Sequence, residues 1–273
     1  MNKVLILGAS GLIGKALIDE YKNDFDLYGT YSSSTTNLPR EKQFQLDITQ
    51  IDILKIILKT INPDIVISCL RGDFNQQLEF HKQLATELKN SKSILYYFST
   101  ANVFDGDFSK PHFETDASIA ESDYGRFKIK CENTLQQILE ERAIIIRIPA
   151  IWGEYSPRMD LIKKGFEDNQ VIDVYSNLEC NNLLDTQLAK QLKYIIDNKL
   201  KGIFHLGSID TMTQAAFFER LINGLSDKKD ILRFNLYKET DKKFYFALKS
   251  NRQDMPNFLQ STNESIISVL RCC

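Results

Sequence analysis

The segment Gly8–Ala9–Ser10–Gly11–Leu12–Ile13–Gly14 follows an apolar run at residues 4–7 and opens an amphipathic run at residues 12–21. A tight turn from a strand into a helix needs a residue without a Cβ atom, and a third glycine lets the helix pack closely on the strand. Backbone N–H groups at the helix start then face a pyrophosphate, whose negative charge the helix dipole favours. The segment predicts a dinucleotide-binding turn, with a purely structural glycine turn as the alternative.

Short apolar runs alternate with longer amphipathic runs along the chain after this turn. Strands are expected at residues 4–7, 27–31, 44–46, 65–69, 94–98, 144–148 and 203–206. Helices are expected at residues 12–21, 51–60, 74–89 and 124–141, and from a cap at Asp185 to about residue 198. Such alternation with nearly all-apolar strands is typical of a parallel sheet that helices cover on both faces. We therefore expect an α/β, doubly wound parallel-sheet Rossmann fold.

The pattern becomes less regular after residue 148, which predicts a second, smaller part of the molecule. We expect residues 1–149 and 181–207 to form the NAD(P)-binding Rossmann domain. Residues 150–180 and 208–273 would then form a small C-terminal substrate lobe.

The composition disfavours several classes of partner. The chain has 273 residues, with 34 Lys and Arg against 36 Asp and Glu, and no basic stripe that would suit nucleic acid. No apolar run approaches the ~20 residues of a membrane span, and the N-terminal run is too short for a signal-peptide core. The five cysteines include no Cys-x-x-Cys pair, so neither a metal site nor a disulfide framework is indicated. We expect a cytoplasmic protein with a small-molecule substrate, and a homodimer is left open.

Residues after the second, third and fourth expected strands are candidates for cofactor binding. Many dinucleotide sites carry an acid about 20 residues past the glycines, yet residues 28–34 hold hydroxyls, including Tyr31 and Ser32, and no Asp or Glu. A carboxylate would repel a 2′-phosphate and hydroxyls would not, so the segment favours NADP slightly over NAD. Asp47 either accepts from the adenine amino group or caps the helix at 51–60. Arg71 binds a phosphate or is an ordinary surface arginine.

The segment Asp123–Tyr124–Gly125–Arg126–Phe127–Lys128 contains Y-x-x-x-K at the start of an expected helix. Residues i and i+4 share one helix face, so an ammonium beside the phenol would lower the tyrosine pKa and tune Tyr124 as a proton donor or acceptor. Lys128 could also hold the nicotinamide ribose. A hydroxyl at the end of the preceding strand would hydrogen-bond the substrate carbonyl, and Ser99 and Thr100 both qualify.

Together these segments resemble the extended short-chain dehydrogenase/reductase family, in particular its branch of dTDP-4-dehydrorhamnose reductases and related sugar-nucleotide-binding proteins. The resemblance covers about residues 1–210. It is carried by residues 8–14, 46–48, 63–67, 99–100, 103–106, 124–128 and 147–153.

The resemblance implies a catalytic triad of Thr100, Tyr124 and Lys128, and it selects Thr100 over Ser99. It also implies that hydride leaves nicotinamide C4, that Tyr124 protonates the alkoxide, and that a nucleotide sugar binds between two lobes. We expect the cofactor to contact Gly8, Ser10, Gly11, Leu12, Ile13, Gly14, Tyr31, Ser32, Asp47, Ile48, Cys69, Leu70, Arg71, Tyr124, Lys128 and Pro149. We expect the substrate to contact Asn102, Arg158 and Trp152, although Trp152 could equally be ordinary core.

The sequence departs from the family pattern near the substrate. The usual Asn-Ala-Ala is replaced by Ser68–Cys69–Leu70, and the usual Asp-Tyr after the Ser-Thr pair by Ala101–Asn102. Because the related 4,6-dehydratases need two acids there, dehydration is disfavoured. We therefore predict an NAD(P)H-dependent reductase of a keto-sugar nucleotide. The alternatives are a nucleotide-sugar epimerase that recycles its hydride, and a non-catalytic NAD(P)-binding regulatory subunit like that of methionine adenosyltransferase, to which the resemblance extends.

Overall fold

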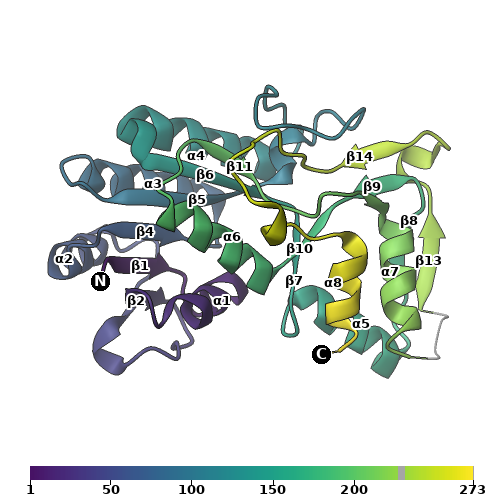
Figure 1. Ribbon diagram of the computed structural model, residues 1–273, viewed down its shortest axis with the longest axis horizontal. Helices are drawn as coiled ribbons and strands as arrows, with labels where there is room; N and C mark the ends of the chain where they lie inside the picture. Colours follow the sequence, from purple (N-terminus) through teal and green to yellow (C-terminus); the bar gives the residue numbers. More distant parts are fainter. Residues whose placement is uncertain (227–230, 273) are drawn as a thin grey trace.

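The computed structural model describes residues 1–226 and 231–272, and it has a sheet domain beside a smaller lobe (Figure 1). Within the described residues, seven parallel strands form the sheet of the larger part in the order β11-β6-β5-β4-β1-β2-β3. These strands are β1 (Lys3–Leu7), β2 (Asp26–Tyr31), β3 (Gln43–Gln45), β4 (Ile65–Ser68), β5 (Ile94–Thr100), β6 (Ala143–Ile148) and β11 (Ile203–His205).

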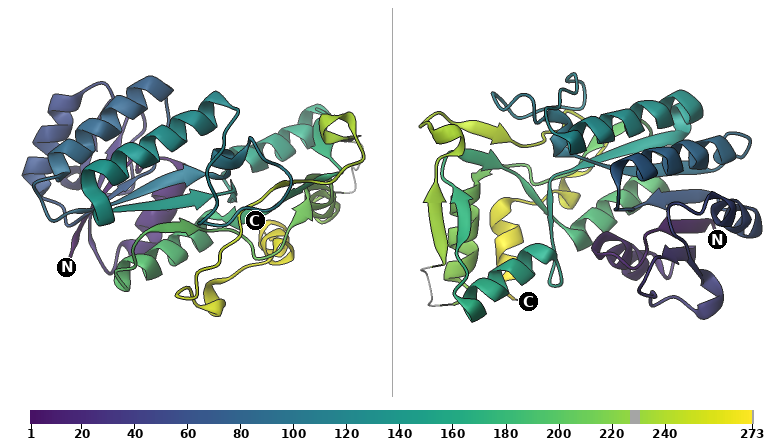
Figure 2. Two further views of the ribbon diagram at one scale, coloured as in Figure 1. Left: turned by 90° about the horizontal axis from the view of Figure 1, so that it is seen from above. Right: turned by 180° about the vertical axis from the view of Figure 1, so that it is seen from behind.

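Helices cover both faces of this sheet (Figure 2). One face carries α1 (Leu12–Tyr21) and α6 (Asp185–Asp197), and the other carries α2 (Ile51–Ile61), α3 (Phe74–Leu88) and α4 (Asp123–Leu139). Side chains alternate along a strand, so Ile6 packs with Leu17 of α1 and Leu192 of α6, whereas Leu7 packs in a second cluster with Leu84 of α3. The predicted doubly wound Rossmann fold is therefore confirmed.

The expected cap of α6 is displaced by one residue. Asp185 is the first helical residue, and Leu184 occupies the cap position without a side-chain bond. Leu184 also ends β10 (Asn182–Leu184), which pairs in parallel with β7 (Ala150–Trp152). The strand therefore continues up to the helix and leaves no loop residue to act as the cap.

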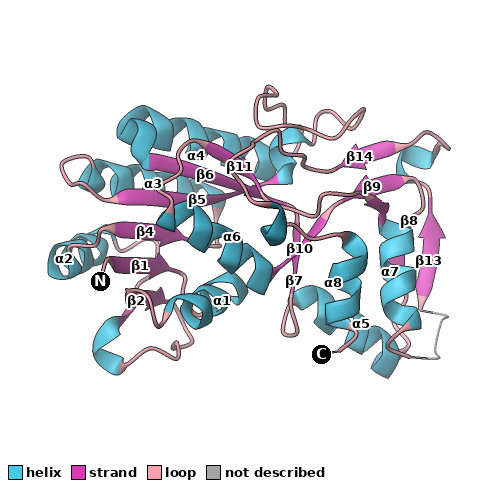
Figure 3. Ribbon diagram, viewed as in Figure 1, coloured by secondary structure: helices cyan, strands magenta, loops and turns pink. Residues whose placement is uncertain are grey.

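The lobe packs helices against short strands around its own apolar core (Figure 3). Trp152 of β7 meets Met159, Phe217 and Ile266 in this core, all of them buried. The lobe's other elements are α5 (Pro157–Asp168), β8 (Ile172–Tyr175), β9 (Leu178–Cys180), β12 (Met212–Thr213), α7 (Gln214–Asn223), β13 (Leu232–Asn235), β14 (Phe244–Phe246) and α8 (Asn263–Leu270). Short 3-10 helices are η1 (Arg40–Lys42), η2 (Ala101–Phe104), η3 (Glu140–Arg142), η4 (Tyr237–Glu239) and η5 (Asn257–Leu259).

Between β14 and α8 the chain runs back along the sheet domain. The guanidinium of Arg252 lies 3.7 Å from the ring centroid of Phe204 in β11. Gln191 of α6 donates to the carbonyl oxygen of Leu259 at 2.8 Å. These contacts attach residues 252–259 to the edge of the sheet, and the domain division predicted from the sequence stays a prediction.

Two classes of feature are missing from the described part of the chain. None of its helices combines the length and the apolar character that crossing a bilayer demands. Its His, Cys, Asp and Glu side chains also form no group of three that could hold a metal ion.

Gly14 supplies a test of how tightly the first helix packs. A Cβ atom there would lie 2.6 Å from both the Cα of Ala9 and the carbonyl oxygen of Gly8, which are backbone atoms that cannot turn aside. Alanine gains up to about 1 kcal/mol of helix propensity over glycine, but overpacking costs about 1–3 kcal/mol. We therefore expect Gly14→Ala to lower the free energy of unfolding in urea, while Lys15→Ala on the exposed face of the same helix does not. Equal stability of the two variants would show that the contact is loose.

Candidate active site

Two adjoining cavities lie where the carboxyl ends of the parallel strands meet, at the point where the strand order reverses between β1 and β4. The first, of about 420 Å³, follows the glycine turn, and the second, of about 560 Å³, lies between the sheet domain and the lobe. Ile13, Cys69, Leu70 and Arg71 line both cavities. Ligands of open α/β sheets bind at this kind of position, so the cavities form one candidate site.

The glycine turn leaves the start of α1 open toward the first cavity. Gly8 has a φ of +80°, as predicted for a turn that requires glycine, and its N–H donates to the Thr30 hydroxyl at 3.1 Å. Gly11 is the N-cap of α1 and makes no side-chain capping bond. Because no side chain of the turn caps them, the first N–H groups of the helix are available to an anion such as a pyrophosphate.

The structure brings the residues predicted to bind the cofactor into the two cavities. The first is lined by Gly8, Ser10, Gly11, Leu12, Ile13, Gly14, Tyr31, Ser32, Asp47, Ile48, Cys69, Leu70 and Arg71. The second is lined by Pro149, Tyr124 and Lys128 together with Thr100, Asn102, Trp152 and Arg158. Sequence reasoning missed Thr30, Leu46, Gly72, Asp73 and Gln76 in the first cavity. The first three each adjoin a residue that the strand ends had already singled out, whereas Asp73 and Gln76 lie farther along the chain.

Asp47 does not cap α2, so that alternative is wrong. Its Oδ1 accepts from the backbone N–H of Thr49 at 2.8 Å and from the Thr49 hydroxyl at 2.6 Å, and Gln50 takes the cap position. The two bonds from Thr49 lower the pKa of Asp47. The carboxylate is therefore held ionised at the rim of the first cavity, where it can accept a hydrogen bond from a ligand.

Thr100 ends β5 and is held by its neighbours at the wall of the second cavity. Its hydroxyl donates to Oδ1 of Asn102 at 3.0 Å and accepts from the Asn102 N–H at 3.3 Å. Asn102 in turn donates to Asp105 at 3.3 Å, and Asp105 accepts from Ser122, the N-cap of α4. This chain of bonds connects the end of β5 to the start of the helix that carries Tyr124.

The expectation that Lys128 lowers the pKa of Tyr124 is wrong. The Lys128 Nζ lies 6.0 Å from the centroid of the Tyr124 ring and donates instead to the Tyr97 hydroxyl at 3.1 Å and the Phe98 carbonyl at 2.8 Å. Burial raises the pKa of Tyr124, and a hydrogen bond with Thr100 and the charge of Arg71 oppose that rise. The i, i+4 spacing fixes the shared helix face but not the direction of a long lysine side chain.

Lys128 is a buried lysine, and burial disfavours the charged form of its side chain. Burial is the main cause that lowers its pKa to about 8; Cys131, Glu132 and Cys69 oppose this shift and Arg71 adds to it. An ammonium has three N–H donors, and two of them are used by Tyr97 and Phe98. Among the described residues, the third is left for a ligand hydroxyl.

Two arginines give the second cavity a positive charge. Arg158, in the first turn of α5, makes one long bond to the carbonyl of Ile151 at 3.5 Å. Burial and the nearby charge of Arg71 lower the pKa of Arg158. Neither arginine forms an ion pair with any carboxylate in the described chain, so the cavity suits an anionic ligand.

Trp152 lines the second cavity as part of the lobe core. It is 1 % exposed, its indole N–H donates to Asn182 at 2.8 Å, and its ring lies edge-on to Phe218. The neighbouring lining residues Asn181, Asn182, Gln214, Phe217 and Phe246 were missed. They come from lobe segments where the sequence pattern was irregular, so no strand end marked them.

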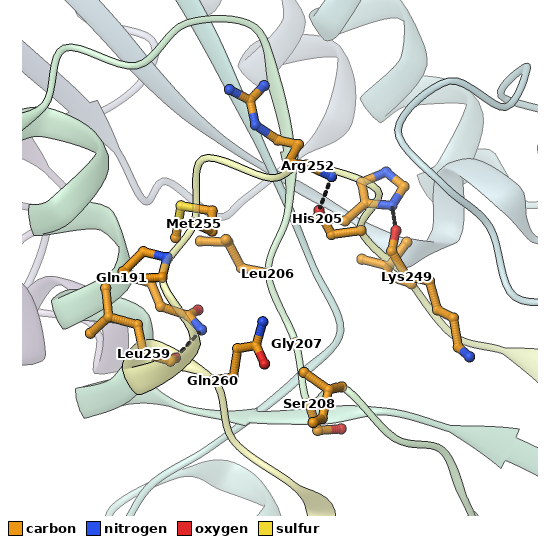
Figure 4. Close-up of a pocket in the computed structure, with 14 residues that line it drawn as sticks. Gln191, His205, Leu206, Gly207, Ser208, Lys249, Arg252, Met255, Leu259 and Gln260 are labelled. Carbon is orange, nitrogen blue, oxygen red and sulfur yellow. Dashed lines mark hydrogen bonds between the residues drawn. The ribbon is translucent and has the colours of Figure 1, made fainter.

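A third cavity, of about 140 Å³, lies apart from these residues, against β11 and the returning segment (Figure 4). His205 at its wall has Nδ1 3.1 Å from the His112 carbonyl and 3.0 Å from the Lys249 carbonyl, while Nε2 faces Arg147 at 3.3 Å. These partners assign the proton to Nδ1, and burial lowers the histidine pKa to about 4. The ring is neutral and both of its nitrogens are hydrogen-bonded, so His205 has a structural role here.

Residues 1–244 match the family described as the RmlD substrate binding domain. The chain belongs to this family. The match bears out the dTDP-4-dehydrorhamnose reductase branch of the extended short-chain dehydrogenase/reductases that the motifs suggested.

Two proteins with similar sequences differ from each other in their described roles. The methionine adenosyltransferase 2 subunit beta of Danio rerio is 26% identical over 243 residues, which cover 78% of this chain and 71% of that protein. The probable low-salt glycan biosynthesis reductase Agl14 of Haloferax volcanii is 21% identical over 260 residues, which cover 87% of this chain and 85% of that protein.

Solved structures share the fold over almost the whole chain. The dTDP-4-dehydrorhamnose reductase of Bacillus anthracis in complex with NADP has a TM-score of 0.79 at 20% identity, covering 98% of both chains. The dTDP-glucose 4,6-dehydratase of the same organism in complex with NAD has a TM-score of 0.82 at 14% identity, covering 100% of this chain and 96% of that one. These likenesses show that the chain shares the fold of both structures.

The burial of Lys128 predicts a contribution to stability that rises with pH. The folded protein loses the Lys128 proton at about pH 8, whereas an unfolded chain keeps it to about pH 10.4. At this site the unfolded state binds more protons in this interval, so Lys128 adds roughly 1–3 kcal/mol to the free energy of unfolding as the pH rises. The raised pKa of the buried Cys69, Cys131 and Cys180 thiols acts in the opposite direction, so the contribution of Lys128 is read as the difference between wild type and Lys128→Met. Urea unfolding from pH 7.5 to 10 should show that Lys128→Met removes this contribution and that Lys130→Met, on the exposed face of α4, keeps it. Parallel curves for wild type and Lys128→Met would contradict the assignment.

Proposed function

We propose that the protein reduces the carbonyl group of a keto-sugar nucleotide with a nicotinamide cofactor, NADP in preference to NAD. One observation carries the proposal: Thr100, Tyr124 and Lys128 line a single cavity that continues into the cavity of the glycine turn. A dinucleotide that spans both cavities would have its adenosine by Ser32 and Asp47. Its pyrophosphate would lie at the start of α1. The preference for NADP rests on the hydroxyls of residues 31–34, where no carboxylate repels a 2′-phosphate.

The triad residues can divide the reaction between them. A reduced nicotinamide supplies the hydride that the carbonyl carbon receives. The Thr100 hydroxyl would exchange its bond to Asn102 for one to the carbonyl oxygen, which gains negative charge. Tyr124 would then give that oxygen its phenolic proton, and the raised pKa of Tyr124 keeps the proton in place at neutral pH until it is needed. The hydrogen bond with Thr100 and the charge of Arg71, which favour the ionised form of Tyr124, would stabilise the phenolate left behind. The third N–H of Lys128 would be free to bind the cofactor ribose.

The cavity favours a diphosphate and disfavours dehydration. Arg71 and Arg158 provide two guanidinium groups without ion-pair partners in the described chain, which suits the two phosphates of a nucleotide sugar. Ala101 and Asn102 offer no carboxyl group beside the reacting carbon. A reductase needs only the one acid that Tyr124 provides.

A second candidate is a cofactor-binding regulatory subunit, which the likeness to the methionine adenosyltransferase subunit favours. The change of the usual Asp-Tyr to Ala101–Asn102 in the wall of the cavity also fits such a role. A third candidate, an epimerase, would recycle its hydride and consume no reduced cofactor. Net oxidation of NADPH at about 340 nm with a panel of keto-sugar nucleotides separates a reductase from both.

Removing the Tyr124 hydroxyl should abolish turnover. We expect Tyr124→Phe to reduce kcat by at least ~100-fold because no other acid takes its place, while the Kd for NADPH changes by less than about threefold. Tyr194→Phe, on α6 and outside the cavities, is the matched control. Unimpaired NADPH oxidation by Tyr124→Phe would refute the assignment of the acid.

Arg158 should act on substrate binding alone. We expect Arg158→Gln to raise KM for the nucleotide sugar by about 10–100-fold, the loss of one or two charge-assisted hydrogen bonds, with little change in NADPH affinity. Arg220→Gln, which breaks only an exposed ion pair with Glu264 in the same lobe, is the control. An unchanged KM in Arg158→Gln would place the diphosphate elsewhere.

A further inference from the structure

A buried ion pair adjoins the triad without lining the cavity. Glu132 of α4 and Arg147 of β6 are 2 % and 4 % exposed. The Arg147 Nη2 donates to Oε2 of Glu132 at 2.7 Å and its Nε donates to Oε1 at 3.1 Å. This two-bond geometry fixes the carboxylate in one orientation.

The same carboxylate bonds to a third element. The Ser99 hydroxyl of β5 donates to Oε1 of Glu132. Ser99 immediately precedes Thr100, and Arg147 is two residues before Pro149 at the nicotinamide side of the cavity. Glu132 therefore connects α4 to the neighbours of site residues on two strands.

Glu132 also shares a helix face with the catalytic pair. Tyr124, Lys128 and Glu132 follow one another at intervals of four residues, which places them one above the other along α4. A bond that holds Glu132 against β5 and β6 thus sets the height and rotation of Tyr124 and Lys128 relative to Thr100.

Stability alone does not account for the pair. Taking two charges out of water costs several kcal/mol per ion, and a well-packed apolar pair of similar size is often as stable or more stable. The surrounding sheet is built from buried Ile and Leu side chains that could have continued through this position. A buried pair of this kind is better explained by its effect on the position of α4 and of the site residues that this helix carries.

The charge of Glu132 acts on Lys128 as well. The groups that act on the ammonium are Arg71, the thiols of Cys69 and Cys131, and Glu132, and its nitrogen bonds Tyr97 and the Phe98 carbonyl. Burial raises the pKa of both thiols and of the Tyr97 phenol, so these groups are neutral near pH 8. Within this set Glu132 is the carboxylate that favours the charged lysine.

The other groups in contact with Arg147 are uncharged, and Glu114, the carboxylate beside His205, bonds the His205 backbone N–H and not the guanidinium. The guanidinium donates to the Ser118 hydroxyl at 2.9 Å, faces the neutral His205 ring, and lies 5.1 Å from the ring centroid of Phe104. Glu132 and Arg147 therefore balance each other's charge, and removing one leaves the other uncompensated.

We propose that Glu132 is a positioning residue of the active site: its carboxylate fixes α4 against β5 and β6 and so places Tyr124 and Lys128 relative to Thr100. The proposal rests on the function proposed above. It predicts that the reach and the charge of Glu132 have separable effects on the triad.

Glu132→Gln tests the charge because it keeps the length of the side chain. We expect kcat to fall at least tenfold, the Kd for NADPH to stay within threefold, and the alkaline limb of the kcat profile to move by at least half a pH unit toward lower pH. Glu132→Asp tests the reach: kcat should fall while the alkaline limb stays in place. Glu79→Gln on the exposed surface of α3 is the control and should change neither quantity.

Two further measurements keep the test decisive. If Glu132→Gln does not fold, the double variant Glu132→Gln with Arg147→Met removes both charges, and a folded double variant should still lose turnover. If the wild type shows no turnover, the proposed function fails, but the role of Glu132 can still be tested. The free energy of unfolding in urea is then measured against pH with and without Lys128→Met, both in the wild type and in Glu132→Gln, and the difference within each pair gives the pH at which Lys128 loses its proton. That pH should be lower in Glu132→Gln than in wild type. A folded variant with unchanged kcat, or an unchanged Lys128 titration, overturns the role of Glu132.

Discussion

Parallel pairing of β1 with both β2 and β4 is the constraint on which the site depends. Val4 lies opposite Leu27 on one side and opposite Ile65 on the other, so the two halves of the sheet extend from β1 in opposite directions. The loops after β1 and β4 consequently diverge and leave room between them for the two cavities. The glycine turn follows β1, and Cys69 and Arg71 follow β4. They lie close together because these two parallel strands are neighbours and end at the same edge of the sheet.

The chemistry of the site follows from a second constraint, the cost of keeping charge out of water. Lys128 is buried beneath the cavity floor, and its pKa falls to about 8 as a result. The protein offsets this cost with the Tyr97 hydroxyl, the Phe98 carbonyl and the carboxylate of Glu132 rather than with a direct ion pair. For Tyr124 burial outweighs the opposing hydrogen bond with Thr100 and the charge of Arg71, so its pKa is raised and it remains a phenol.

The sequence was informative wherever local chemistry decides structure. The glycine turn, the apolar strands and the expected helices need only neighbours in the chain, and they were placed within a few residues. The cap of α6 was misplaced because β10 runs directly into the helix, a contact with the distant β7 that no local pattern reveals. The prediction that Lys128 lowers the pKa of Tyr124 was wrong because the lysine side chain turns toward Tyr97, which belongs to β5. The lobe lining was missed because it is assembled from segments far apart in the chain.

The lobe's assembly from distant segments also sets an order of folding. Each of the strands β1 to β6 pairs with neighbours within the first 148 residues, so the sheet can form while synthesis continues. Trp152 cannot complete its core until α8 arrives with Ile266. Contacts across such long chain separations form slowly, because the entropy of closing the loop must be overcome first. During that interval the unfinished chain exposes an aromatic surface, and this is the stage at which chaperones would be expected to bind it.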